Sequence, residues 1–451
     1  MLEHGLPSSG AAAAVAALVS LGTLASSIAR TTAAEVEIAW TVEVQDQPAD
    51  ALMVEPVLAI NPKDARHLVA ASITGTAEGM GTMVFSSRDG GRTWSAGRQA
   101  GATDPLFPDI DPVVAFDPDG TPYLSTLHDG FAVWKRGEND TAWVRVGTVP
   151  GGSYDRQWLA FDLSGGAHHG RLYSAGKVGI QVTDSPAEDV AAFSWSDDGG
   201  ASFRAPVLVL PAPTLGSLNI VSGLVVLEDG SLLASYQFIH WPEGGIPEGG
   251  RWTPTSLDSD VAVLRSRDGR QWSEPVRIGR MRQWGHGEQE GMLKGLGSGG
   301  LAAGHGVVHA VWLDIVDGFL QVMVARSTDA GATWSAAWRV NRGGLASNHS
   351  NPGVAVDGLG NVGVIWNDRR DDPDDRCFRP YFSASRDRGE TFEPEVALTG
   401  EPVCPPDGRW LNGGETQGLV GLPEGGFHAV WVGRGNGQGT SRLHSTRIRV
   451  R

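Results

Sequence analysis

SSRDGGRTWS at residues 86–95 is the first copy of a repeat, because close variants of this string occur again along the chain. The variants are SWSDDGGASFR at 194–204, ARSTDAGATWS at 325–335 and ASRDRGETFE at 384–393, with a shortened form, RSRDGRQWS, at 265–273. Self-similarity over a long period is the sequence signature of a repeat architecture. The chain is therefore expected to build one structural unit several times.

The shared core of these strings reads Ser-x-Asp-x-Gly-x-Thr/Ser-Trp/Phe, and each string lies between two strand-like runs. An Asp accepts hydrogen bonds from turn amides, a Gly adopts positive φ, and an aromatic ring anchors the turn on the sheet. We predict that each string folds a hairpin between the third and fourth strands of its unit and has no catalytic role. The residues of this structural repeat are Ser87, Asp89, Gly91, Trp94, Ser196, Asp198, Gly200, Phe203, Ser327, Asp329, Gly331, Trp334, Ser385, Asp387, Gly389 and Phe392.

Seven further segments share another pattern: an apolar strand, a Gly/Asp turn and a second strand, as in DPVVAFDPDGTPYLS at 111–125. Seven units of about 45–75 residues approach the size of a four-stranded propeller blade. The predicted fold class is all-β, a β-propeller of four-stranded blades, with seven blades favoured and six the alternative. The last unit lacks a fourth strand, and VEIAWTVEVQ at 36–45 precedes the first. We expect this N-terminal strand to complete the last blade and close the ring, which protects the sheet edges.

The chain of 451 residues carries a formal net charge of −16, which argues against nucleic acid or an anionic membrane as a partner. Residues 11–29 resemble the apolar region of a signal peptide, although residues 1–10 contain no Lys or Arg. We predict a signal peptide over 1–34, a single propeller domain over 35–451, and a secreted, periplasmic or extracellular monomer without a membrane span. Cys377 and Cys404 form one bridge in such a compartment or remain free thiols.

Four repeat strings and a degenerate fifth, set on a propeller pattern, resemble the sialidase-like superfamily of BNR, or Asp-box, repeats. EPVLAINP (55–62), DRQWLAFD (155–162) and WNDRRDD (366–372) are similar to recurring phrases of its bacterial secreted members. The resemblance covers about 36–451 and implies a propeller that hydrolyses a terminal acidic sugar of the sialoside type.

The family's sialidases hold the substrate carboxylate with three arginines. They use a Tyr activated by a Glu as the nucleophile and an Asp as general acid and base. The Phe/Tyr-Arg-Ile-Pro motif that carries the first arginine is absent ahead of Ser87, and its nearest approximation is FRP at 378–380.

The innermost strands of a propeller begin around its axial funnel, so their first residues are the natural candidates for a site. Two carboxylates there could supply the acid and base of glycoside hydrolysis, and hard oxygen ligands could instead hold Ca²⁺. The alternative is that these side chains cap strand ends or pair with neighbouring arginines. The candidates are Glu55, Asp109, Asp111, Asp155, Arg156, Glu288, Glu290, Asn348, Asn351 and Glu415.

The motif DRQW is the strongest single candidate. Arg156 offers a planar fork for a carboxylate, Asp155 could orient that fork or act as an acid, and Trp158 could pack beneath a sugar. The structural alternative is an Arg–Asp pair beside a core Trp.

WNDRRDDPDDR at 366–376 concentrates five aspartates and three arginines just beyond a strand. Arg369 or Arg370 could face the funnel while the aspartates of 371–375 bind calcium or simply face water. For a Tyr nucleophile, Tyr381 and Tyr154 are the positions to test.

These observations together predict an exo-glycoside hydrolase that acts on an acidic sugar of a glycan or glycoconjugate. The catalytic candidates are Asp111, Asp155, Glu290, Glu415 and Tyr381. The substrate-binding candidates are Arg156, Arg369, Arg370, Glu55 and Trp158. No cofactor is expected to be required, with Ca²⁺ as a possible ligand. A non-catalytic secreted propeller that binds glycan or protein is the alternative, and a lyase of acidic polysaccharide is the third interpretation.

Overall fold

The computed structural model describes residues 36–77, 79–128, 130–136, 142–151, 154–180, 188–209, 218–239, 256–257, 259–284, 299–404, 413–437 and 439–451. Throughout these ranges every regular element is a β-strand. The predicted signal peptide at 1–34 lies outside them. No helix of the described residues is long and apolar enough to cross a membrane.

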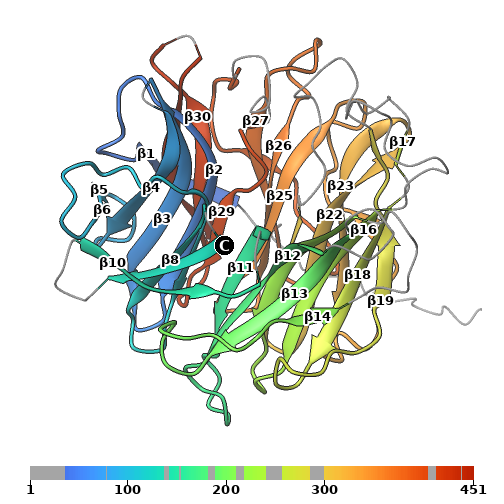
Figure 1. Cartoon of the computed structure of the whole chain (residues 1–451). Coiled ribbons are helices and arrows are strands. Elements are labelled where there is room, and N and C mark those ends of the chain that lie inside the picture. The colour runs from blue at the N-terminus through green and yellow to red at the C-terminus, as the bar shows by residue number, and fades with distance from the viewer. Residues whose placement is uncertain are drawn as a thin grey trace, which may run out of the picture. The chain divides into compact units, whose positions relative to one another are not determined.

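The strands form seven four-stranded blades, which confirms the predicted fold class and its favoured blade count (Figure 1). The first blade contains β2 (Leu52–Asn61), β3 (Asp64–Thr76), β4 (Gly79–Ser87) and β5 (Ser95–Ala96). The second contains β7 (Ile110–Phe116), β8 (Pro122–His128), β9 (Gly130–Arg136) and β10 (Ala142–Val149), and β6 (Arg98–Gln99) adds to β10 in parallel. The third contains β11 (Tyr154–Phe161), β12 (Leu172–Ile180), β13 (Glu188–Ser196) and β14 (Val207–Val209).

The remaining blades follow the same plan. The fourth contains β15 (Leu218–Val226), β16 (Leu232–Ile239), β18 (Ser259–Ser266) and β19 (Val276–Arg280). Two short strands, β17 (Ser256–Leu257) before β18 and β20 (Gln283–Trp284) after β19, pair with each other in a separate antiparallel sheet. The fifth contains β21 (Gly299–Gly304), β22 (Val307–Val316), β23 (Phe319–Ser327) and β24 (Trp338–Arg339). The sixth contains β25 (His349–Val356), β26 (Val362–Asp368), β27 (Arg379–Ser385) and β28 (Val396–Ala397). The seventh contains β29 (Gly418–Gly421), β30 (Phe427–Arg434), β31 (Ser441–Val450) and β1 (Val36–Glu43).

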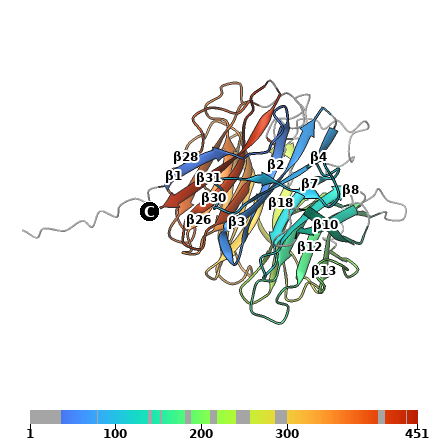
Figure 2. The same cartoon turned by 90° about the vertical axis from the view of Figure 1, so that its left-hand side faces the viewer.

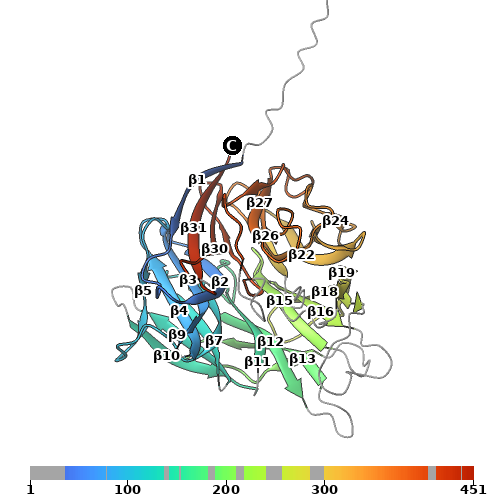
Figure 3. The same cartoon turned by 90° about the horizontal axis from the view of Figure 1, so that it is seen from above.

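The ring closes through the N-terminal strand, as predicted. Strand β1 pairs antiparallel with β31, from Val36 opposite Val450 to Glu43 opposite His444, so the first and last strands share one sheet (Figure 2). Each innermost strand contacts the innermost strand of the next blade, including the β29–β2 pair that completes the circle (Figure 3). This arrangement leaves no blade without two neighbours and protects the sheet edges.

The blades have a common polarity that defines two faces. We call the face at which the innermost strands begin the upper face, and the opposite face the lower face. The loops between second and third strands lie on the upper face, because the strands of a blade are antiparallel. The hairpins between first and second strands, and those between third and fourth strands, therefore lie on the lower face.

The repeated strings form the hairpins between third and fourth strands, as predicted, in blades 1, 3, 4, 5 and 6. In the four full repeats the serine hydroxyl donates to the aspartate, and the glycine N–H donates to the serine Oγ at 2.8 Å. Hydrogen bonds, first among them those from the side chains of Ser202 and Thr333, lower the pKa of Asp198 and of Asp329 to about 2. These hydrogen bonds of the serine and aspartate side chains lie within the turn, as expected for a structural role.

The glycine of the repeat also packs one blade against the preceding one. A β-carbon on Gly91 would lie 2.3 Å from His428 in the last blade, and one on Gly389 would lie 2.6 Å from His309 in the fifth blade. Real β-carbons do not approach other atoms so closely. The glycine is therefore required for close packing as well as for positive φ, which its turn chemistry alone did not indicate.

The core lies between blades as layers of apolar side chains. The cluster between blades 5 and 6, for example, includes Val322, Val364 and Trp366, each with 0% of its surface exposed. Burying an aromatic or aliphatic side chain of this kind stabilises a fold by roughly 1.5–3 kcal/mol relative to leaving it in water. Packing of this kind joins neighbouring blades around the ring.

Candidate functional site

Three residues at equivalent positions of different blades have left-handed backbone geometry although none is glycine. They are Glu55 in β2 (φ 55°), Asp111 in β7 (φ 53°) and Asn351 in β25 (φ 54°), and each precedes a proline. The strand register shifts through a β-bulge at all three positions. Left-handed geometry costs a non-glycine residue about 1–2 kcal/mol, and a bulge re-aims a side chain. Strain of this kind is concentrated at functional sites.

Residues of the last blade contact Glu55, which belongs to the first blade. The Glu55 N–H donates to the carbonyl oxygen of Gly413 at 3.0 Å. A β-carbon on Gly414, whose φ is 93°, would lie 2.1 Å from Cγ of Glu55. Only 8% of Glu55 is exposed. Glycine at 414 is therefore necessary for the observed position of the Glu55 side chain.

Glutamines from adjacent blades hold the other two left-handed residues. Gln157 in β11 donates its side-chain amide to the main-chain oxygen of Asp111. Gln417, just before β29, donates to the main-chain oxygen of Asn351 at 3.3 Å and to Oδ1 of Asn367 at 2.9 Å. Each of the three strained residues is thus contacted from a neighbouring blade.

Carboxylates lie at the upper face on three consecutive blades, 7, 1 and 2. Glu415 precedes β29, Glu55 lies in β2, and Asp109 and Asp111 lie at the beginning of β7. Asp109 is buried and accepts a hydrogen bond from the Thr126 hydroxyl at 2.8 Å, so it belongs to the packing of its own blade. Asp111 and Glu415 are half-buried. Among the acidic candidates whose side chains the structure describes, Glu55, Asp111 and Glu415 remain predicted site residues.

Arg369 comes directly after β26 and is enclosed, with only 1% of its surface exposed. Its Nη1 donates to the Ser350 hydroxyl at 3.2 Å, and its guanidinium lies 5.8 Å from the ring centroid of Phe378. Burial lowers the pKa of Arg369. The guanidinium of Arg369 thus lies beneath the protein surface, against Ser350, the residue before the strained Asn351. It is enclosed, although Arg369 is a predicted ligand of a substrate carboxylate.

Arg370 belongs to a buried ionic network. Its Nη2 lies 2.5 Å from Asp368 Oδ2 and 2.8 Å from Glu395 Oε1, and His349 Nε2 lies 2.9 Å from the same Asp368 oxygen. Burial acts to raise the pKa of Asp368, but His349 and Arg370 outweigh it and hold that pKa well below its usual range. These contacts are structural and offer no support for the predicted role of Arg370 in substrate binding.

Tyr381 and Trp158 both lie in packed surroundings. The Tyr381 ring belongs to the core cluster between blades 5 and 6, with the Arg370 guanidinium 4.3 Å from its centroid. Its hydroxyl donates to Asp371 at 3.2 Å, and burial raises its pKa. The Trp158 indole packs against the core of blades 3 and 4 and donates to the Val221 carbonyl at 3.0 Å. Among the described residues, the contacts found for these two side chains are with their own surroundings and not with Glu55 or Asp111.

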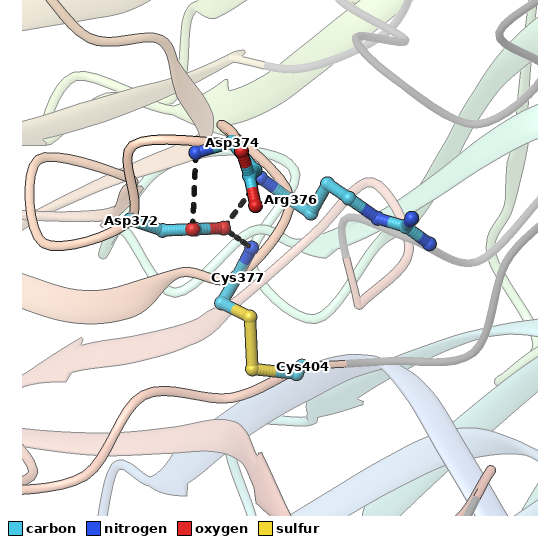
Figure 4. Close-up of a disulfide and its surroundings, with 5 residues drawn as sticks. All are labelled: Asp372, Asp374, Arg376, Cys377 and Cys404. Atoms are coloured by element: carbon cyan, nitrogen blue, oxygen red, sulfur yellow. Dashed lines mark hydrogen bonds between the residues drawn. A yellow bond between two sulfur atoms is a disulfide. The ribbon is translucent and has the colours of Figure 1, made fainter.

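A disulfide joins Cys377, in the loop between β26 and β27, to Cys404, which follows β28, and settles the two alternatives for these cysteines (Figure 4). Asp372 accepts hydrogen bonds from the backbone N–H groups of Arg376 at 2.7 Å and Cys377 at 2.6 Å. Asn348 Nδ2 donates to Asp375 at 2.5 Å and ties the loop to the beginning of β25. Two of the loop's aspartates therefore shape the loop itself.

Several predicted positions lie wholly or partly outside the description. Glu288 and Glu290 lie outside the described residues, and Tyr154, Asp155 and Arg156 are described only as backbone of β11. In the described part of the chain, no three His, Cys, Asp or Glu side chains gather in a way that could hold a metal ion. Calcium binding stays a prediction.

A cavity of about 250 Å³ lies on the lower face between blades 4 and 5. Its walls are largely apolar and include Val226, Leu227, Val307 and Val308, with Glu228 and Asp229 as the charged members. None of the predicted site residues lines it. The cavity is therefore separate from the carboxylates of the upper face.

No known family profile matches the chain, and no curated protein matches it in sequence. Among solved structures, a polysaccharide lyase described as an ulvan lyase aligns with a TM-score of 0.55 and 14% identity, over 90% of this chain and 95% of that chain. A protein of unknown function from Dyadobacter fermentans aligns with a TM-score of 0.50 and 13% identity, over 92% of this chain and 99% of that chain. The Trypanosoma rangeli sialidase aligns at a TM-score of 0.41 with 14% identity, over 88% and 55% of the two chains. At these identities the likeness shows the propeller fold alone.

Sequence reasoning missed Gln157, Gln417 and Gly414. A signal for the glutamines was present, because both occupy the repeat position that Pro56, Pro112 and Pro352 fill in other blades. Aligning the seven units on their hairpins would have shown this substitution. The requirement for glycine at 414 depends on a contact across the seam of the ring, which no local pattern reveals.

Proposed function

We propose that the chain cleaves the glycosidic bond of an acidic sugar at the upper face, beside Glu55, Asp111 and Glu415. The observation that carries the proposal is the left-handed bulge at both Glu55 and Asp111. Two adjacent innermost strands, β2 and β7, therefore carry a carboxylate at the corresponding position of their bulges. A pair of positioned carboxylates is what glycoside hydrolysis uses as acid and base.

In this proposal Asp111 is the general acid that protonates the leaving-group oxygen. Glu415 is the general base that takes a proton from a water molecule as the water oxygen attacks the anomeric carbon and the bond to the leaving group breaks, and Glu55 contacts the sugar between them. Arg156, which follows Asp155 in β11 of the next blade, is the arginine proposed for the substrate carboxylate. Arg369 acts from behind Ser350 as a positive charge that favours an anionic sugar, because its enclosed guanidinium does not reach the surface.

Elimination by a polysaccharide lyase is the second candidate. The lyase that aligns with a TM-score of 0.55 was also solved bound to a -[GlcA(1-4)Rha3S]- unit, an acidic saccharide. That likeness supports an acidic glycan as the substrate class without choosing between hydrolysis and elimination.

Product analysis tests both candidates. The purified protein is incubated with α-sialosides, glucuronides and ulvan-type polysaccharide, and the products are followed as new reducing ends and as ultraviolet absorbance of an unsaturated uronate. Reducing ends without absorbance support hydrolysis, and reducing ends with absorbance support elimination. Absence of turnover on every substrate, together with glycan binding on an array, would overturn both in favour of a non-catalytic binding propeller.

A further inference from the structure

Gln157 lies in β11 beside the proposed site, but its side chain is almost entirely enclosed, with 3% of its surface exposed. Its amide nitrogen donates to the main-chain oxygen of Asp111 in the preceding blade. A residue so enclosed acts on a substrate only through its neighbours. Its neighbour in this case is the backbone of the proposed general acid.

The carbonyl of Asp111 lies within a β-bulge. The register of β7 against β8 shifts between Ile110 and Val113, so the residues between them drop out of the regular ladder. Pro112 brings no N–H group to the bulge. A backbone carbonyl in such a bulge is stabilised by a hydrogen bond from a side chain, and the Gln157 amide donates one to Asp111.

The same device occurs a second time in the ring. Gln417 in blade 7 donates to the main-chain oxygen of Asn351 in blade 6, where a left-handed residue again precedes a proline within a bulge. The two glutamines occupy the same position of their repeats. The recurrence shows that an amide from an adjacent blade is a built feature of these bulges.

We propose that Gln157 is a positioning residue for Asp111: its amide holds the left-handed bulge and thereby aims the Asp111 carboxyl group. This inference rests on the proposed function of Asp111 as the general acid. Gln157 itself touches no substrate atom. Its loss is expected to reduce kcat and kcat/KM together, because the misplaced group acts in the transition state.

Two variants test the proposal. Gln157→Met keeps the shape of the side chain and removes the donor, and kcat is expected to fall roughly 10-fold to 100-fold with KM little changed. Gln157→Glu restores a donor only while the introduced carboxylic acid is protonated. Its activity relative to the parent protein is therefore expected to be high at acidic pH and to fall as the pH rises.

Asp198→Asn, in the lower-face hairpin of the same blade, serves as the matched control for stability, and its activity per folded molecule should equal that of the parent. A Gln157→Met variant with parental kcat would overturn the proposal. A Gln157→Glu variant whose relative activity does not depend on pH would also overturn it, because a purely structural role predicts that result.

Crystal structures separate this inference from the proposed function. In Gln157→Met the φ of Asp111 is expected to leave the left-handed region, whereas a φ still near 53° would overturn the inference whatever the activity. If the parent protein turns over no acidic glycan, the proposed function fails, and the φ comparison alone decides whether Gln157 holds the bulge.

Discussion

The Glu55 side chain packs directly against Gly414 where the first and last blades meet. A β-carbon on Gly414 would lie 2.1 Å from Cγ of Glu55. Glu55 belongs to β2, and Gly414 precedes β29 of the blade that the N-terminal strand β1 completes. The position of the Glu55 carboxylate therefore depends on the closure of the ring. A change at the seam is expected to affect chemistry as well as stability.

Gly414→Ala should displace the Glu55 side chain and impair turnover to about the same degree as Glu55→Gln. The alanine also strains a backbone whose φ is 93°, at a cost of roughly 1–3 kcal/mol. Urea unfolding and steady-state kinetics measure the two effects separately.

Gly101→Ala is the matched control for that variant. Gly101 has a φ of 80°, and nothing lies within 4 Å of a β-carbon added there. Gly101→Ala should lower stability through backbone strain alone and leave kcat unchanged. Equal kcat in Gly414→Ala and Gly101→Ala would contradict the link between the seam and Glu55.

The fold was predictable because its signals are local and repeated. The string at 86–95 carries turn chemistry that is legible without tertiary context, and its recurrence implies blades. The unpaired strand at 36–45 and the incomplete last unit together indicated how the ring closes.

The candidate site was only partly predictable, because its geometry arises from contacts between blades. The placement of Glu55 and Asp111 in the first halves of inner strands followed from the blade pattern, but their left-handed backbone did not. The enclosure of Arg369 behind Ser350 depends on the packing of a loop that a disulfide restrains. Periodicity along one strand contains no information about such contacts.

His428 should make the protein less stable as the pH is lowered. The side chain is fully buried between the repeat turn of blade 1 and the Ser445 hydroxyl, and burial lowers its pKa to about 3. The unfolded chain binds a proton near the ordinary value of about 6.5, whereas the folded chain does not. The free energy of unfolding is therefore expected to decrease as the pH falls below 6.5 toward 3.

His428→Gln should flatten that decrease, while the exposed control His169→Gln should leave it unchanged. Urea unfolding at several pH values between 7 and 4 measures the slope. An unchanged slope in His428→Gln would contradict the assignment of the effect to this imidazole.

Asp329→Asn should weaken the hairpin of the fifth blade without affecting the site. The Asp329 carboxylate accepts hydrogen bonds from the backbone and hydroxyl of Thr333 at 2.8 and 2.6 Å. Its lowered pKa means that the contribution is present above about pH 4 and is lost as the pH falls toward 2. Scanning calorimetry at pH 7 should show a Tm about 2–4 °C lower. A loss of kcat per folded molecule would contradict a purely structural role.

Reduction of the Cys377–Cys404 bond should destabilise the protein. The two cysteines are 27 residues apart in the sequence. A cross-link over a loop of that length reduces the entropy of the unfolded chain and raises its free energy by about 3–4 kcal/mol. Urea unfolding with and without a reductant measures the difference. The double variant Cys377→Ser/Cys404→Ser should reproduce the reduced protein and be insensitive to reductant. Equal midpoints in all four conditions would contradict a stabilising role.

We propose that acidic-glycan cleavage occurs at the carboxylates of blades 7, 1 and 2. The most direct measurement is the turnover of an acidic glycoside by Asp111→Asn, compared with the lower-face variant Asp198→Asn and the parent protein. Asp111→Asn is expected to lose about 10²–10⁴-fold in kcat/KM, while Asp198→Asn is expected to retain full activity per folded molecule. Parental activity in a folded Asp111→Asn variant would contradict the placement of the reaction at this face.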